Sequence, residues 1–390
     1  MGNVNQMSFN QLSTVLNEIT QQVTGRSSLA PQNTSEFVSV AQKTLQAGYD
    51  PVLNAINQMV TKTIFSIRPY DRKFGGLMVD NQRYGAITRK ISIADKPFED
   101  DARFDLIDGG SVDPWKINKP NILQLNYYGA NIYEKSLTVF RDQLDNAFTG
   151  PEQMSEFLSM TLDNVSNMIE QAHETTARAT IANMIGGKIA ADNGVIHLLT
   201  EYKEKTGLSE LTQQSIYQPE NFKPFMEWVF SRIEEISMMM SERTSLYQIE
   251  VEGKPIIRHT PRSYQKIYLY APAKAAIDAR VLTNEFHDNY LKFADNEGVT
   301  FWQNALNPDS ISVTPTYLGT DGNLIIGENV EQANVFGVMF DRDAMGYTVM
   351  NQWSASTPMN PKAGYATSYW HFTEKYWNDF TEKCVVLLLD

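Results

Sequence analysis

The chain has 390 residues, of which 42% are hydrophobic and 11% aromatic, a composition typical of a folded globular protein. Its 33 Lys and Arg residues face 46 Asp and Glu residues, and this net charge of −13 argues against a general nucleic-acid binder, because such binding is driven by cations that displace phosphate counterions. The single cysteine excludes an internal disulfide framework; with no signal-peptide pattern and no apolar run long enough to span a bilayer, the sequence predicts a soluble cytosolic product.

The first predicted element is a helix from Ser8 to Val23, in which apolar residues recur at helical spacing. Ser8 fits the N-cap position and Gly25 fits the stop. The apolar stripe is narrow, so we expect an arm that lies on a neighbouring chain. Two short helices are predicted on either side of a break at residues 49–51.

Residues 64–140 favour strands over helices. The stretches YGAITRKISI and NILQLNYYGANIY alternate apolar and polar residues, and between them lies an insert rich in turn formers and acids. An insert of roughly 30 residues is too long for an ordinary loop in a compact domain, and such loops are usually functional or projecting. The sequence therefore predicts a long projecting hairpin.

Charge is divided unevenly over this hairpin. Residues 62–92 hold seven cations and two acids, whereas residues 93–113 hold seven acids and two cations. Two interpretations stay open: a solvated hairpin of mixed surface charge, or a complementary head-to-tail contact between copies of the chain, acidic tip onto basic base. The candidate contact residues are Arg72, Lys73, Arg83, Arg89, Lys90, Asp100, Asp101, Asp105 and Asp108.

The strongest helix signal runs from Pro151 to Ile185, about 50 Å at 1.5 Å per residue, with Gly186 and Gly187 interpreted as its stop. One face is apolar and the other polar, so we expect the helix to lie along a surface or a sheet. His173 opens the sequence HETTA, which lacks the second histidine of a zinc-protease helix. We therefore interpret His173 as a polar-face or interface residue.

The second half of the chain mixes both kinds of element. Residues 186–220 suggest a mobile segment, after which helices are predicted at 222–245 and 273–280, with the strand IYLYAP between them. Short strands punctuated by Gly, Asn and Pro fill the chain from residue 310 onward. Because helices and strands are segregated instead of alternating, the predicted fold class is α+β.

Candidate chemistry concentrates in YWHFTEKYWNDFTE, residues 369–382. One hypothesis is a cytosolic hydrolase that uses carboxylates and His371. Alternation instead predicts a strand with both faces partly covered, ahead of a buried last strand at 385–389, in which Cys384 is a buried thiol. On this interpretation His371 and Glu374 serve folding or assembly, and no catalytic, metal-binding or cofactor-binding residue and no cofactor is assigned.

The stretches IFSIRPYDRKFGG, RYGAITRKISIAD and FDRDAMGYTVMNQW, together with NPKAGYATSYWHFTEKYWNDFTEKCVVLLLD, resemble major capsid proteins of tailed bacteriophages. More narrowly, they are similar to those of small short-tailed (podovirus-like) phages that infect Gram-positive hosts. The resemblance runs in order over roughly residues 34–390, and its most specific part is the C-terminal block.

This resemblance implies the shell fold of phage Hong Kong 97, with an N-terminal arm, an extended loop, a peripheral domain with a long spine helix, and an axial domain. The implied boundaries are 1–60 for the arm, 61–130 for the extended loop and its base, 131–220 for the peripheral domain with a spine helix at 151–185, 221–340 for the axial domain, and 341–390 for C-terminal strands that return to the peripheral domain.

The implied function is a non-enzymatic structural one: self-assembly, as pentamers and hexamers, into an icosahedral or prolate shell of the virion around double-stranded DNA. The implied partners are further copies of the chain, a separate scaffolding protein, a portal protein and non-specifically contacted DNA on the inner face, with no membrane; synthesis is expected in the bacterial host cytoplasm. Lys90 and Lys96 are available for a covalent crosslink, but no Asn partner is identified. An encapsulin-type compartment shares the fold and stays an alternative.

Overall fold

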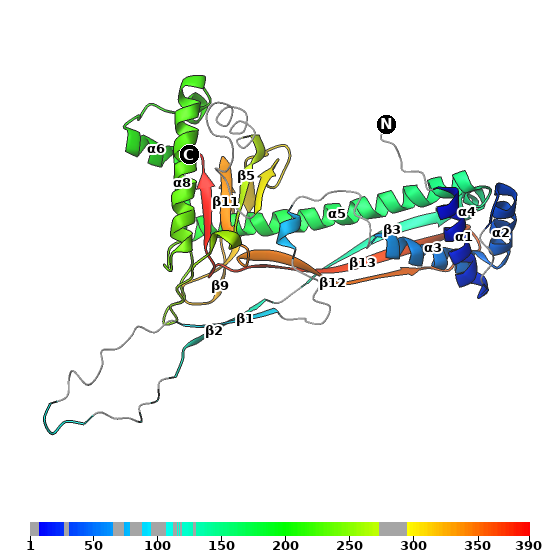
Figure 1. Ribbon diagram of the computed structural model, residues 1–390, viewed down its shortest axis with the longest axis horizontal. Coiled ribbons are helices and arrows are strands. Elements are labelled where there is room, and N and C mark those ends of the chain that lie inside the picture. The colour runs from blue at the N-terminus through cyan, green and yellow to red at the C-terminus, as the bar shows by residue number, and fades with distance from the viewer. Residues whose placement is uncertain are drawn as a thin grey trace.

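The computed structural model describes residues 8–26, 31–64, 74–78, 88–94, 107–111, 115, 117, 119–127, 130–272 and 295–390. A long helix lies along a narrow sheet, a second sheet stands upright at one end of that helix, and a thin hairpin projects from the same end (Figure 1). The N-terminal helices gather at the opposite end. None of the described helices is long and apolar enough to cross a membrane.

The long helix is α5, Pro151–Ala190, with Gly150 at its N-cap and Pro151 in the first turn. Its predicted end at Ile185 is wrong, because Gly186 and Gly187 lie inside the helix. A Cβ atom on Gly186 would meet Val313 Cγ1 at 2.5 Å, and one on Gly187 would meet the Phe380 ring at 2.6 Å. The two glycines therefore let neighbouring elements approach the helix closely instead of ending it.

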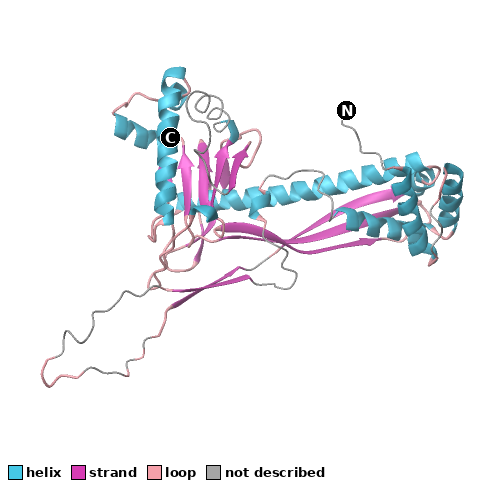
Figure 2. Cartoon of the chain, in the orientation of Figure 1, coloured by secondary structure: helices cyan, strands magenta, loops and turns pink. Residues whose placement is uncertain are grey.

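Three antiparallel strands lie along α5: β3 (Asn131–Phe140), β12 (Met345–Ser356) and β13 (Tyr365–Asn378), in the order β12-β13-β3. Figure 2 shows them as a long, twisted ribbon beneath the helix. Trp370 and Phe372 of β13 are buried together with Val165 and Ile169 of α5. The predicted alternation in this strand is confirmed, since buried and half-buried residues alternate from Tyr365 to Glu374.

The N-terminal region forms three helices, α1 (Phe9–Thr24), α2 (Thr34–Gln46) and α3 (Tyr49–Ile64), beside the short helix α4 (Arg141–Ala147). Ser8 caps α1 and Gly25 ends it in the left-handed conformation, as predicted. The apolar stripe of α1, expected to cover a neighbouring chain, is instead covered by its own chain, and a contact of α1 with a neighbour stays a prediction. Its apolar residues Leu12, Leu16 and Ile19 are buried against the chain's own helices and the start of α5, because the three narrow stripes cover one another.

The upright sheet has five strands in the order β4-β14-β11-β5-β6. Their bounds are Val195–His197 (β4), Cys384–Leu388 (β14), Val335–Asp341 (β11), Gln265–Tyr270 (β5) and Asp295–Val299 (β6). One face packs on α8 (Pro219–Ser241), α6 (Leu198–Thr206) and α7 (Gln213–Ile216), and the other on the end of α5. β14 is buried throughout, as predicted.

Residues 186–220 are not the loose segment that the sequence suggested. They contain the last turn of α5, strand β4 and helices α6 and α7. Leu198 and Leu199 of α6 are buried against the upright sheet, so tertiary packing holds a segment whose own periodicity is weak. The helix predicted at 273–280 lies outside the described residues.

Short strands complete the structure. β1 (Thr88–Ile93) and β2 (Ile122–Tyr127) pair antiparallel as the base of the hairpin, with Thr88 opposite Tyr127. β7 (Ile311–Val313) pairs with β10 (Val330–Gln332), and β8 (Thr316–Leu318) pairs with β9 (Leu324–Ile326). The last fifty residues contribute to both sheets: β12 and β13 join β3, whereas β14 joins β11. The position of β14 in the upright sheet differs from the expectation that residues 341–390 all return to the peripheral domain.

Candidate functional site: the hairpin and its root

The hairpin exposes apolar side chains along its length. Ile91 and Ile93 on β1 are exposed, and further out Ile107 and Ile117 are 80% and 81% exposed. Residues 107–111 lie well away from both sheets (Figure 1). Apolar residues that project this far from a folded body gain little from their own chain, and an exposed apolar surface of this kind is suited to contact with another molecule.

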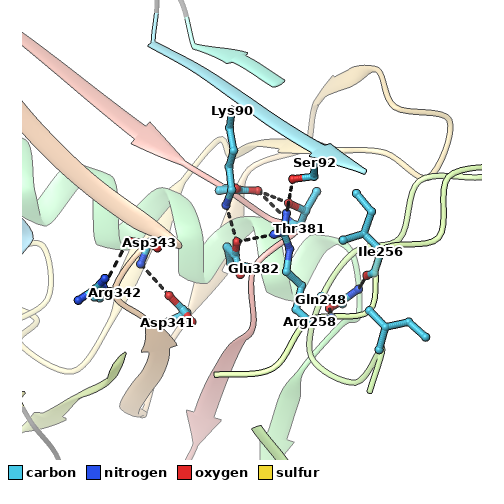
Figure 3. Close-up of polar contacts among 12 residues, drawn as sticks. Lys90, Ser92, Gln248, Ile256, Arg258, Asp341, Arg342, Asp343, Thr381 and Glu382 are labelled. Atoms are coloured by element: carbon cyan, nitrogen blue, oxygen red, sulfur yellow. Dashed lines mark hydrogen bonds and ion pairs between the residues drawn. The ribbon is translucent and has the colours of Figure 1, made fainter. Parts of the chain in front are cut away.

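The root of the hairpin is, by contrast, buried and ionic (Figure 3). Lys90 of β1 donates from Nζ to Asp379 Oδ2 at 2.5 Å and also to Glu382. Both carboxylates lie in the turn between β13 and β14. Arg258 approaches Glu382 Oε1 at 3.2 Å and donates to Ser92 Oγ of β1 at 3.1 Å. Two cations and two carboxylates thus join the hairpin to the body.

Burial and charge act against each other in this cluster. Burial raises the pKa of Glu382, while Lys90 and Arg258 act to lower it. Burial lowers the pKa of Lys90, but the carboxylates of Asp379 and Glu382 more than offset this, so that its pKa is raised overall. Burial, followed by the Asp379 carboxylate, also raises the pKa of the Tyr127 phenol on β2. A charged side chain buried at this root destabilises the fold unless its oppositely charged partners are present.

The turn at residues 378–383, here called the keystone turn, contacts α5, β1 and the loop that follows α8. Asn378 Nδ2 donates to Thr180 O of α5 at 2.9 Å, and Phe380 packs on Gly187 of the same helix. The carbonyl of Phe380 accepts from Ile249 N at 2.8 Å. The keystone turn therefore fixes the hairpin relative to α5 and to the loop that follows α8.

Lys383 fastens the keystone turn to the end of α8. Its Nζ donates to Glu242 O at 2.7 Å and to Thr244 Oγ1 at 3.1 Å. Burial lowers the pKa of Lys383 to about 8, and Glu242 acts in the opposite direction. A cation at the C-terminal end of a helix is favourable, because the last carbonyl groups have no partner in the helix.

The predicted contact residues separate into three groups. Arg72, Lys73, Arg83, Asp100, Asp101 and Asp105 lie outside the described residues. Arg89 and Asp108 are exposed. Lys90 is held by carboxylates of its own chain, so its charge is already matched. The head-to-tail charge contact stays a prediction that depends on the other residues.

His371, the histidine of the hydrolase hypothesis, and His173, from the HETTA sequence, both pack against residues of their own chain. His371 stacks on Trp353 with ring centroids 4.0 Å apart, and its Nδ1 lies 3.7 Å from a carboxylate oxygen of Glu134. His173 is buried against Glu374, so its predicted place on the polar or interface face of the long helix is wrong. Glu374 also accepts from Thr176 Oγ1 at 3.0 Å, which ties α5 to β13.

Sequence reasoning missed the keystone turn itself. The acids at positions 379 and 382 were visible as part of the suspected cluster, but nothing marked Lys90 or Arg258 as their partners. The signal that was available is the density of charged residues directly before a fully apolar strand, since a charge at that depth needs a buried partner.

Solved structures share this fold. The capsid structure of Staphylococcus phage Andhra superposes with a TM-score of 0.51 at 11% identity, over 82% of this chain and 84% of that chain. A chain in the structure of head fiber and inner core protein gp22 of native bacteriophage P68 gives a TM-score of 0.50 at 11% identity, over 82% and 85%. The fold is therefore that of phage capsid proteins, of the Hong Kong 97 type, as predicted.

The family can be stated more narrowly. No curated protein matches the sequence. The family model for Phi29-like phage major capsid proteins matches residues 12–387. The chain belongs to this family: it is a structural, shell-forming protein of the phage virion that associates with copies of itself, and not an enzyme.

Proposed function

We propose that copies of this chain assemble head to tail into pentamers and hexamers, and that these close into an icosahedral or prolate shell. The observation that carries this proposal is the hairpin: it is firmly rooted in its own chain, yet its outer apolar residues are exposed. A contact of one surface with a different surface on the next copy is heterologous, and such contacts generate rings. Burial of the hairpin against neighbours would stabilise each ring.

The charge asymmetry of the hairpin supports the same arrangement. The acidic outer limb of one copy is attracted to the basic base of the next copy. Two acidic limbs, or two basic bases, repel each other. Because Lys90 is already paired with Asp379 and Glu382, Arg89 is the described basic residue to test. Arg89→Glu alone and Asp108→Arg alone should each reduce assembly, and the two chains mixed should assemble better than either alone. Equal assembly of all four preparations would contradict the charge contact.

The shell is proposed to enclose double-stranded DNA, with assembly in the bacterial host cytoplasm on a separate scaffolding protein and around a portal protein. The net charge of −13 supports a weak, non-specific relation to packaged DNA, since an acidic wall does not bind phosphates tightly.

Electron microscopy of the chain expressed together with its neighbouring phage genes tests the proposal. We expect closed particles with pentameric and hexameric units. A small closed oligomer that never forms rings, sheets or particles would overturn it.

A further inference from the structure

We propose that Lys90 and Asp379 of the same chain become joined by an amide bond between Nζ and Cγ, which ties β1 covalently to the keystone turn. Glu382 carries the protons in this step. The bond forms within a single chain and does not depend on the proposed head-to-tail assembly. The ion pair in the structure is the reactant state, and the freshly folded chain contains it.

The reacting groups already lie in contact. Lys90 Nζ is 2.5 Å from Asp379 Oδ2 and also donates to Glu382 Oε1 (Figure 3). A nitrogen that is hydrogen-bonded to a carboxylate oxygen is about 3–3.5 Å from the carboxyl carbon, a separation from which a bond can form. The side chains of Asp379 and Glu382 are 1% and 8% exposed. Because folding holds the amine against the carboxyl group, the reaction is unimolecular, and burial limits the access of the water that would reverse it.

The second oxygen of Asp379 is held by two hydrogen-bond donors. Its Oδ1 accepts from Thr381 N at 2.9 Å and from Thr381 Oγ1 at 2.6 Å. When the amine attacks the carboxyl carbon, negative charge collects on this oxygen in the tetrahedral intermediate, and donors already in place stabilise that charge. The same oxygen then becomes the carbonyl oxygen of the amide.

Glu382 is placed to act as a base. Burial raises its pKa, while Lys90 and Arg258 act to lower it. Its Oε1 lies 3.2 Å from Arg258 Nη1, which holds the carboxylate beside the amine. Burial acts to lower the pKa of Lys90, but the two carboxylates raise it overall. The ammonium must therefore release a proton to Glu382 before Nζ can attack, and the bond forms slowly after folding.

The protons and bonds balance without a further reactant. Of the three protons on the Lys90 ammonium, one stays on the amide nitrogen. Glu382 takes the other two in turn and passes them to Asp379 Oδ2. The Nζ–Cγ bond forms, the Cγ–Oδ2 bond breaks, and Oδ2 leaves as water. Glu382 ends unchanged, and nothing is oxidised or reduced.

A covalent bond here strengthens a thin part of the fold. β1 and β2 form a sheet of two strands, and no other described strand pairs with either of them. A two-stranded hairpin is at best marginally stable by itself. The amide joins residues 289 positions apart, so it holds the hairpin root on the keystone turn under conditions in which an ion pair opens.

Intact-mass spectrometry of the full chain, purified and held folded, tests the bond. We expect the loss of one water, about 18 Da, from the mass calculated for the sequence. After tryptic digestion, tandem mass spectrometry should find a branched peptide that joins Lys90 to Asp379, with no cleavage after Lys90. The exposed pair of Lys223 and Glu227, with Nζ and Oε1 3.7 Å apart, is an internal control and should give no branched peptide.

Two variants separate the bond from the ion pair. Lys90→Arg keeps the cation but cannot form this amide, and Glu382→Gln keeps the shape of the side chain but cannot carry protons. Both should retain their full calculated mass, with folding checked by circular dichroism; if a variant does not fold, the mass and the peptides of the wild type decide. Full mass in the wild type, water loss located instead at an Asp-Gly sequence such as Asp108-Gly109, or equally fast water loss in Glu382→Gln would overturn the proposal.

Discussion

The root and the outer part of the hairpin differ in whether their side chains have contact partners within the same chain. At the root, Lys90 and Arg258 are matched by buried carboxylates of the same chain. In the outer part, Ile107 and Ile117 project into solvent. The root thus has its partners within one copy, whereas the exposed outer part is proposed to gain its apolar contacts from another copy. One hairpin therefore combines a structural anchor with a proposed assembly surface, and mutations should separate the two.

The largest expected effect is on the anchor. Glu382→Ala removes a carboxylate and leaves Lys90 and Arg258 partly buried without it, and loss of one member of a buried ion cluster costs about 3 kcal/mol of unfolding free energy. Urea denaturation monitored by tryptophan fluorescence measures this change.

The matched control for the anchor is Asp108→Ala, an acid on the exposed part of the same hairpin. Its effect on the unfolding free energy should be within about 0.5 kcal/mol. If the two variants lost equal stability, the anchor would have no special role.

A second prediction concerns the helix that supports the keystone turn. Gly187→Ala places a Cβ atom 2.6 Å from the Phe380 ring and 3.0 Å from Tyr317 Cβ. Overpacking costs about 1–3 kcal/mol, against a gain of about 1 kcal/mol in helix propensity, so we expect a net loss of about 1 kcal/mol by urea denaturation. A stabilised variant would contradict the close packing of α5 on the turn.

Cys384 makes one contribution to the pH dependence of stability near the root. Burial raises the pKa of this thiol from 9.0 to about 12, while Lys188 acts to lower it. Between these values the unfolded chain loses the proton and the folded chain keeps it. This stabilising contribution is therefore fully present below pH 9 and falls as the pH rises toward 12, by about 1.4 kcal/mol per pH unit.

The control for this titration is Cys384→Ala, which lacks the thiol. Burial lowers the pKa of the neighbouring Lys188 to about 8, which makes stability rise between pH 8 and 10.5. Because Cys384 acts to raise the Lys188 pKa, the comparison of the two chains measures the thiol together with its coupling to Lys188. Urea midpoints under reducing conditions at pH 8, 9 and 10 should diverge between wild type and variant above pH 9. Parallel curves would show that the thiol titrates alike in both states.

The smallest effect on stability belongs to the outer part. Ile117→Ser should change the unfolding free energy by less than about 0.5 kcal/mol, because the side chain is exposed in the single chain. It should nevertheless reduce the assembled fraction in light scattering. A variant that unfolds more easily, or one that assembles normally, would remove the distinction between anchor and assembly surface.

Local patterns in the sequence were enough to predict much of this structure. Ser8 and Gly25 fixed the ends of α1, and alternation identified β13, because both signals depend on neighbours within a few positions. The glycine pair that includes Gly187 wrongly predicted the end of α5. Its role is to let Phe380 approach the helix closely, and Phe380 is distant in sequence.

The candidate site shows the same limit. The high density of charged residues before β14 is visible in the sequence. Lys90 and Asp379, however, are 289 positions apart, and a periodic pattern of residues does not predict a contact over that separation. The burial of α1 could not be foreseen either, because a narrow apolar stripe does not say whether the same chain or a neighbour covers it.

Hydrogen exchange of the unassembled subunit and of the assembled shell tests the central claim most directly. We expect the hydrogen-bonded amides of β1 at the root, Thr88–Ile93, to be protected in both states, whereas those of residues 107–119 become protected only in the shell. Protection of residues 107–119 in the single subunit, or their free exchange in the shell, would contradict it.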